Sequence, residues 1–400
     1  MSVVVFVDDE PRVLAGLRRL LRSRQGTWDM RFVDGAPAAL ELMAREPVDV
    51  VVSDFRMPGL DGGELLAEVR RRHPEVARLI LSGHTAEKDL MRAVTIAHQF
   101  LTKPCESETL VLAVECALRL RHEIGDERLR SALTGVTALP SSPDALHEVL
   151  QVLDVPESDI KTVVQVIQRD VGLTAKVLQL VNSSFFTLRS RTTSLETAVG
   201  RLGIQTLRSL LLRDDVVRAF DVPEGVSADS VARLNAHALE TALLARRLAA
   251  PDARTDAFCA ALLHECGRLG LAVCRAAAFP APPKVPGHEG RSLADMDSST
   301  FGVSHARAGA YLLSLWGFPE EIVQAVAGHA IAWGPNGPGP LSAASAVRLA
   351  HQLVESESIA LSRAPGVAAI PDDALASAGV LDEVKAWRAR RRPAGKEQVA

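Results

Sequence analysis

The chain has 400 residues, which is enough for two or three domains at about 100–200 residues each. Hydrophobic residues make up 47% and charged residues 24%, which excludes a disordered chain. The first 124 residues carry 17 Lys and Arg against 19 Asp and Glu, and the remaining residues carry 28 against 30, so neither part of the chain has the basic excess typical of nucleic-acid binding. The five cysteines form no CxxC pair, which favours a reducing cytoplasm. No signal peptide and no membrane-spanning apolar run are expected.

Strand-like and helix-like patterns alternate over the first 120 residues. A continuous apolar run predicts a buried strand over residues 3–7, and mainly apolar segments predict further strands over 30–33, 48–52, 79–81 and 100–101. Helical spacing predicts helices from residue 11, over 38–43, around 65–69, near 90–97, and from Ser107, which is expected to be an N-cap. Five such units predict an α/β fold, a doubly wound five-stranded parallel sheet.

The pattern changes after this sheet. Residues 123–134 are charged and predict a linker helix that continues out of the first domain. Residues 135–355 have apolar positions at helical spacing and predict an all-α domain. The remaining 356–400 form an extension, and the arginines at 388–392 predict a disordered basic tail.

Chemically useful side chains follow four of the predicted strands. Asp8 and Asp9 follow the first strand, Asp54 the third, Ser82 the fourth and Lys103 the fifth. Loops at the carboxyl ends of parallel strands meet in one crevice. Three carboxylates close together repel one another, and their hard oxygen atoms suit Mg²⁺. A carboxylate beside such an ion can attack a phosphoryl group, while a lysine and a hydroxyl stabilise the developing charge.

The segments around these residues resemble the receiver domain of bacterial response regulators, over residues 1–122. They are Val-Asp-Asp-Glu at 7–10, Ser-Asp-Phe-Arg-Met-Pro-Gly-Leu-Asp-Gly at 53–62, Leu-Ser-Gly at 81–83 and Leu-Thr-Lys-Pro at 101–104. The resemblance implies a flavodoxin-like fold. It also implies that Asp54 accepts a phosphoryl group from a sensor histidine kinase.

The same resemblance implies roles for the other residues of the pocket. Mg²⁺ would be bound by Asp9, Asp54 and the backbone carbonyl of Arg56, with Asp8 acting through water. Lys103 would contact the phosphoryl group, and Ser82 stands where a Thr is common. Phe100 occupies the family's aromatic switch position, although its pattern is equally that of a core residue.

The second domain carries several histidines within helical patterns: His237, His264 followed by Glu265, His305, His329 and His351. An adjacent His–acid pair suggests a metal hydrolase, in which a metal-bound water attacks a phosphoester. No HxxxH or HExxH spacing places two ligands on one helical turn, so packing or surface roles are the alternative.

The surrounding segments at 169–186, 194–199, 261–270 and 315–319 resemble the HDOD domain, an output module related to HD-type phosphohydrolases. His237 and His264 match two superfamily ligands, whereas Glu265 and His351 stand where aspartates would be. Both changes weaken a metal site. The glycine–tyrosine–proline signature of cyclic-di-GMP phosphodiesterases is absent after His329. We therefore expect these four ligand positions to be degenerate and non-functional, with no stoichiometric transition metal.

Together these patterns predict a cytoplasmic response regulator of a phosphorelay with an all-α, HD-related output. Its partners would be a sensor histidine kinase and a downstream protein that binds the HDOD domain, and it could form a homodimer through the receiver or the linker helix. No membrane or nucleic-acid partner is expected. The alternative is a phosphorylation-regulated, metal-dependent phosphohydrolase or phosphodiesterase of the HD superfamily.

Overall fold

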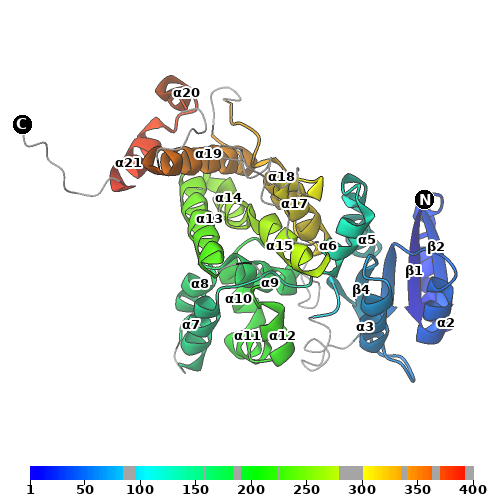
Figure 1. Cartoon of the computed structure of the whole chain (residues 1–400). Coiled ribbons are helices and arrows are strands. Elements are labelled where there is room, and N and C mark those ends of the chain that lie inside the picture. Colours follow the sequence, from blue (N-terminus) through cyan, green and yellow to red (C-terminus); the bar gives the residue numbers. More distant parts are fainter. Residues whose placement is uncertain are drawn as a thin grey trace, which may run out of the picture.

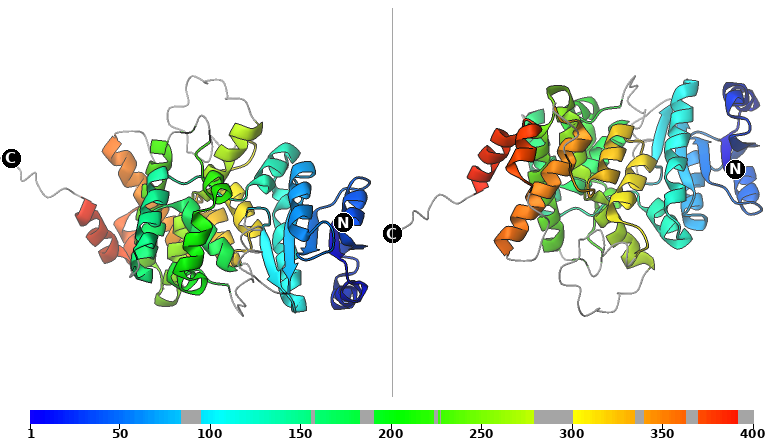
Figure 2. Two further views of the ribbon diagram at one scale, coloured as in Figure 1. Left: turned by 90° about the horizontal axis from the view of Figure 1, so that it is seen from below. Right: turned by 90° about the horizontal axis from the view of Figure 1, so that it is seen from above.

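The computed structural model describes residues 1–83, 95–155, 158–182, 191–223, 226, 228–278, 301–334, 340–362 and 370–391. A parallel sheet with flanking helices occupies the N-terminal part, and helices make up the rest of the described chain (Figure 1). The helical part packs on the side of the sheet where its last strand lies, and the first two strands lie farthest from it (Figure 2).

The N-terminal domain is the predicted five-stranded parallel sheet. Its strands run in the order β2-β1-β3-β4-β5, the flavodoxin-like order. The strands are β1 (Ser2–Asp8), β2 (Trp28–Asp34), β3 (Val50–Asp54), β4 (Ala77–Ser82) and β5 (Gln99–Thr102). The helices are α1 (Pro11–Leu20), the 3₁₀ turn η1 (Arg22–Arg24), α2 (Gly35–Met43), α3 (Gly62–Arg72) and α5 (Ser107–Arg119). Most of the helix predicted near 90–97 lies outside the described residues.

Alternation along the strands builds two cores. Val4 and Phe6 of β1 point to the face that packs with α1 and α5, and this core continues into the helical domain. Val5 and Val7 point to the face covered by α2 and α3. Phe100 of β5 belongs to this second core. One face of the sheet is therefore continuous with the output domain.

The second domain is a helical assembly, as predicted. It begins with η2 (Arg121–Glu123) and α6 (Glu127–Gly135). Then come α7 (Pro143–Asp154), α8 (Ile160–Ile167), α9 (Val171–Asn182), α10 (Leu195–Leu202), α11 (Ile204–Leu211), α12 (Asp214–Ala219) and α13 (Ala228–Leu248). They are followed by η4 (Pro251–Ala253), α14 (Arg254–Leu263), α15 (Cys266–Ala278), α17 (His305–Leu315), α18 (Glu320–Gly328), α19 (Ala343–Ser362), α20 (Asp372–Ser377) and α21 (Leu381–Arg391).

The linker differs from the prediction of one helix continuing out of the first domain. α5 ends at Arg119, and α6 starts afresh because the Asp126 side chain accepts a hydrogen bond from the backbone N–H of Leu129. Ser107 is likewise the first residue of α5 and not its N-cap, since its hydroxyl donates to the carbonyl of Leu20.

The basic C-terminal segment also differs from its prediction. Residues up to Arg391 form α21, which packs on α13 through the buried side chains of Val384 and Trp387. Arg391 forms an ion pair with Glu240 at 2.8 Å. The arginines predicted to be a disordered tail are thus part of a helix up to 391, and residues 392–400 lie outside the described residues.

One stretch, Pro251–Cys274, is long and apolar enough to cross a membrane by length and composition. However, 78% of the 18-residue window that passes this test is buried inside the protein. Its apolar character is therefore that of a core helical segment of the second domain.

Candidate functional site

The carboxyl ends of the strands bring the predicted acidic pocket together. The Lys103 Nζ lies 2.6 Å from Asp8 Oδ2 and 2.5 Å from Asp54 Oδ1. Asp8 ends β1, Asp54 ends β3, and Lys103 directly follows β5. Three residues predicted from separate segments thus meet at one edge of the sheet, with the ammonium group between the two carboxylates.

The environment of Asp54 suits a nucleophile. Burial raises its pKa, and the neighbouring Lys103 opposes this shift without cancelling it. The backbone N–H of Arg56 donates to Asp54 Oδ2 at 3.0 Å and fixes the carboxylate. Gly62 is required beside it, because a Cβ there would lie 1.9 Å from the Asp54 carbonyl oxygen. This glycine lets the start of α3 approach the end of β3.

Asp9 and Ser82, the other side chains predicted for the pocket, lie at the carboxyl ends of β1 and β4. Asp9 follows the end of β1 and is partly buried. Ser82 is the buried last residue of β4, and its carbonyl accepts from the Lys103 backbone N–H at 2.8 Å. Carboxylates from two strand ends, with Asp9 next to them, form the hard oxygen donor set that Mg²⁺ prefers.

The opposite end of β5 meets the output domain at the C-terminus of α17. This helix ends in a Schellman motif, in which Gly317, with a φ of 76°, donates to Ser314 and Phe318 donates to Leu313. The last helical carbonyl, that of Leu315, accepts instead from Gln99 Nε2 at 3.0 Å. A side chain of the receiver sheet therefore completes the cap of an output helix.

A second buried polar contact crosses the same interface. His98 Nδ1 accepts from the backbone N–H of Arg78, so Nε2 carries the proton and donates to the Thr134 carbonyl at 2.8 Å. Thr134 of α6 also bonds to Tyr311 of α17. Burial lowers the pKa of His98 well below its ordinary value, with Arg78 adding to the shift.

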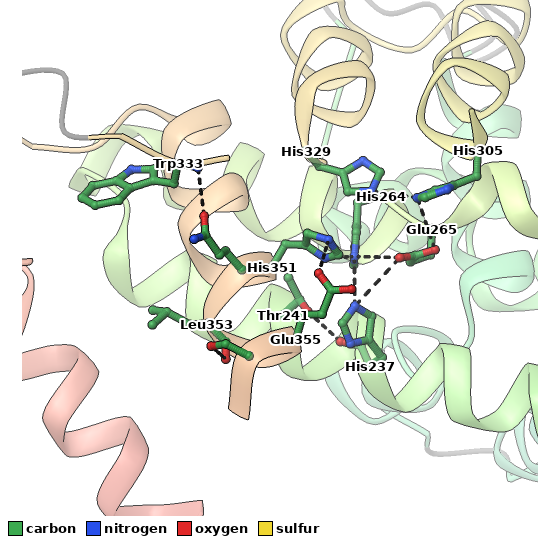
Figure 3. A network of polar contacts seen from close by, with 12 residues as sticks. His237, Thr241, His264, Glu265, His305, His329, Trp333, His351, Leu353 and Glu355 are labelled. Atoms are coloured by element: carbon green, nitrogen blue, oxygen red, sulfur yellow. Dashed lines mark hydrogen bonds and ion pairs between the residues drawn. The ribbon is translucent and has the colours of Figure 1, made fainter. Parts of the chain in front are cut away.

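The ligand positions that were predicted to be degenerate converge in the second domain (Figure 3). His264 Nε2 lies 3.2 Å from His237 Nε2, 3.2 Å from His351 Nδ1 and 3.5 Å from Glu265 Oε1. His237 lies on α13, His264 and Glu265 follow α14, and His351 lies on α19. Among the described residues, these four form one of two groups whose ligand atoms all lie within 4.8 Å of one another.

The other group shares Glu265 and adds His305, at the start of α17, and His329, directly after α18. His305 Nε2 lies 3.1 Å from His329 Nε2 and 3.8 Å from Glu265 Oε2. The guanidinium of Arg268 pairs with this same carboxylate oxygen. Sequence reasoning had noted His305 and His329 but gave them no part in the site, and the only available signal was their residue type.

Burial favours the neutral form of His264, His329 and His351, which is the form that binds metals. It lowers the pKa of His264 and His351 well below the ordinary value and that of His329 to about 4. Burial alone would raise the pKa of Glu265, but the positive charge of Arg268 outweighs it and lowers that pKa to about 2, so the carboxylate is ionised.

Comparison with known proteins separates the chain into two parts. Residues 4–115 match the family model of the response regulator receiver domain, and residues 139–332 match that of the HDOD domain. The hydrogenase transcriptional regulatory protein HoxA of Cupriavidus necator is 38% identical over 127 residues, which is 31% of this chain and 26% of that protein. The transcriptional regulatory protein GlrR of Escherichia coli K12 is 31% identical over 162 residues, 40% of this chain and 35% of that protein.

A solved structure gives a similar match. The signal receiver domain of an HD domain-containing protein from Pseudomonas fluorescens is 30% identical, with a TM-score of 0.29, and the match covers 30% of this chain and 98% of that one. The matches to HoxA and GlrR each span about a third or less of the relative's own length.

The parallel sheet with its Asp–Lys–Asp pocket defines a receiver domain. The chain contains an N-terminal response regulator receiver domain and a C-terminal HDOD domain.

Proposed function

We propose that a sensor histidine kinase phosphorylates Asp54 and that the receiver relays this state to an HDOD domain that acts by binding another protein. The observation that carries the proposal is the pairing of Lys103 with both Asp8 and Asp54 at the edge of the sheet. The matched receiver domain supports a kinase as the phosphodonor.

In the transfer, an oxygen of Asp54 attacks phosphorus and the phosphorus–nitrogen bond of the donor phosphohistidine breaks, leaving the imidazole to take up a proton. Mg²⁺, when bound, would neutralise the charge shared by the carboxylates and the phosphoryl oxygens. The Lys103 ammonium group, which now pairs with Asp54 Oδ1, is within reach of a phosphoryl oxygen attached there. The hydroxyl of Ser82 is a second donor at the same edge.

The relay would use the short strand β5. It has four residues, so Gln99 at one end lies about 13 Å along the strand from Lys103 beyond the other end. Lys103 contacts the acceptor aspartate, and Gln99 caps α17 of the output domain. Phosphorylation would shift the equilibrium between two arrangements of this contact, because it changes the charge that Lys103 faces.

The remaining parts of the proposal concern partners and location. The HDOD domain would bind a downstream protein, the protein would reside in the cytoplasm, and a homodimer could form through the receiver. A pull-down that compares wild type with Asp54→Asn tests the output, and the bound proteins should differ between the two.

The phosphoacceptor itself is tested by labelling with acetyl phosphate and Mg²⁺. We expect one phosphoryl group on the wild type and none on Asp54→Ala, as measured by intact mass. Asp34→Ala is the matched control, because Asp34 also ends a strand of this sheet but lies exposed at the end of β2. Undiminished labelling of Asp54→Ala would refute the assignment.

One observation favours a second function, metal-dependent phosphoester hydrolysis: imidazoles and a carboxylate converge in the output domain. That function requires turnover that depends on added metal and that His264→Ala abolishes. A nucleotide hydrolysis screen with added metal distinguishes it from a binding module.

A further inference from the structure

Four side chains from three parts of the helical domain direct ligand atoms at one point (Figure 3). They are His237, His264, Glu265 and His351, with ligand atoms 3.2–3.9 Å apart along the contacts that join them. We propose that these residues bind a single divalent transition-metal ion, of which Zn²⁺ is the best match, in a closed four-coordinate site. The site would join α13, α14 and α19.

The spacing of the ligand atoms fits such an ion. Tetrahedral zinc has bonds of 2.0–2.1 Å to imidazole nitrogen, which places ligand atoms about 3.3–3.4 Å apart. The two contacts of His264 Nε2 with His237 and His351 are 3.2 Å each, and its distance to Glu265 Oε1 is 3.5 Å. Only small movements of side chains would close this set around an ion.

The proton positions point the same way. His264 Nδ1 contacts the Ala261 carbonyl, an acceptor, so the proton of the neutral ring is on Nδ1 and the lone pair is on Nε2. That single lone pair faces nitrogen atoms of both His237 and His351 at equal distance. One lone pair aligns well with only one N–H donor, whereas a cation at the centre interacts with the lone pairs of all three rings.

Outer contacts orient the ligands as they do in known metal sites. His351 presents Nδ1 to His264, and its Nε2 lies 3.5 Å from Glu355 Oε2, one turn further along α19. A carboxylate behind a ligating histidine fixes the ring and increases its basicity. His264 has the corresponding support from the Ala261 carbonyl.

The adjacent group would not hold a second ion. Its shared ligand atom, Glu265 Oε2, already pairs with the positive charge of Arg268. His329 Nδ1 donates to the Val326 carbonyl at 2.7 Å, which leaves the lone pair of its Nε2 facing His305 Nε2 at 3.1 Å. A proton between these two nitrogens satisfies both rings, and the positive charge of Arg268 beside Glu265 Oε2 opposes a second cation.

This inference replaces the expectation of a metal-free domain, which rested on the two changes from aspartate. The change at His351 removes a charge but supplies a nitrogen donor that reaches His264. The longer side chain of Glu265 still places Oε1 within 3.9 Å of both His237 and His264. Three imidazoles and one carboxylate suit zinc and cobalt better than Mg²⁺.

The test is a Co²⁺ titration of the full chain after treatment with a chelator, followed by displacement with Zn²⁺. We expect one equivalent of Co²⁺, with the intense visible absorption of a four-coordinate ion, and its loss on adding one equivalent of Zn²⁺. His237→Gln and Glu265→Gln should each weaken Co²⁺ binding at least about tenfold. Circular dichroism confirms folding, and His237 is the variant least harmful to it because its side chain is 26% exposed.

Two controls separate the possible outcomes. His147→Ala removes an exposed histidine of α7 and should leave the titration unchanged. His305→Gln should also retain one equivalent. Absence of tight Co²⁺ binding by the folded wild type, or binding unaffected by His237→Gln and Glu265→Gln, would overturn the site. Two equivalents in the wild type that fall to one in His305→Gln would overturn the single-ion assignment.

Discussion

Replacing Gln99 with methionine should loosen the contact between the receiver and the output domain. The Gln99 side chain is buried and donates from Nε2 to the carbonyls of Leu315 and, at 3.4 Å, Ala113. The other carbonyls at the end of α17 accept from the backbone N–H groups of Trp316, Gly317 and Phe318, which belong to the output domain itself. Leu315 alone among them depends on the receiver, so the substitution removes a cap that no neighbouring backbone group replaces.

The magnitude follows from the burial of both partners. Methionine keeps the length and shape of glutamine, so the packing of the site changes little. A buried carbonyl left without a donor costs about 1–3 kcal/mol. Since 1.4 kcal/mol is a factor of ten, the population in which the two domains separate should rise about 5-fold to 140-fold.

Hydrogen exchange measures this change directly. The amides of Gly317 and Phe318 close the end of α17 and should exchange faster by the same factor in Gln99→Met. Gln324→Met is the matched control, since Gln324 is exposed on α18 and bonds only to Glu320 among the contacts described. That variant should stay within about 0.5 kcal/mol of wild type in urea unfolding. Equal exchange rates and equal stability in the two variants would refute the capping argument.

Two further predictions concern the receiver. Asp9→Ala should sharply weaken Mg²⁺ binding in a calorimetric titration, because the ion loses a carboxylate ligand. The fold should hold or gain stability, because repulsion among the acids is relieved. Glu10→Ala, which removes the adjacent exposed acid, is the control, and an unchanged Mg²⁺ affinity in Asp9→Ala would count against the pocket. His98 should make stability depend on pH. Its pKa is lowered in the folded state by burial and by Arg78, Lys176 and Arg70, so its contribution is intact above the unfolded value of about 6.5 and is lost as pH falls below it. Relative to His98→Gln, wild type should lose up to about 1.4 kcal/mol per pH unit in urea unfolding between pH 6.5 and 5, and equal slopes would contradict this.

The order of elements in the receiver could be predicted because each strand contains a short apolar run that is followed by a polar residue. The C-terminal helix could not, because its stability comes from contacts distant in sequence. Val384 and Trp387 are buried against α13, and Arg391 pairs with Glu240, which lies 151 positions earlier. The local composition there resembles that of a solvated basic tail. The segment is an ordered helix because it packs on α13, a contact that the composition does not reveal.

The candidate sites show the same division. Asp8, Asp54 and Lys103 could be found from sequence because parallel topology requires strand ends to meet. Gln99 could not, since an amide at the start of a short strand gives no sign of the helix end it will cap. His305 and His329 were visible as histidines, but their places at the start of one helix and just after another depend on how the domain packs.

The last prediction is that the output domain leaves cyclic-di-GMP intact even when it holds a metal. Hydrolysis by an HD-type centre needs a metal with an open position for the attacking water. In the site inferred above, three imidazoles and Glu265 already provide four ligands, which is the closed arrangement of a structural zinc. The neighbouring pair, His305 and His329, is buried, and Arg268 occupies the outer oxygen of the shared carboxylate. Purified full-length protein loaded with Zn²⁺, and separately with Co²⁺, should therefore show no product by chromatography, whereas His264→Ala should lose metal and thermal stability. Hydrolysis that requires metal and disappears in His264→Ala would show that a coordination position is open and that the output domain is an enzyme.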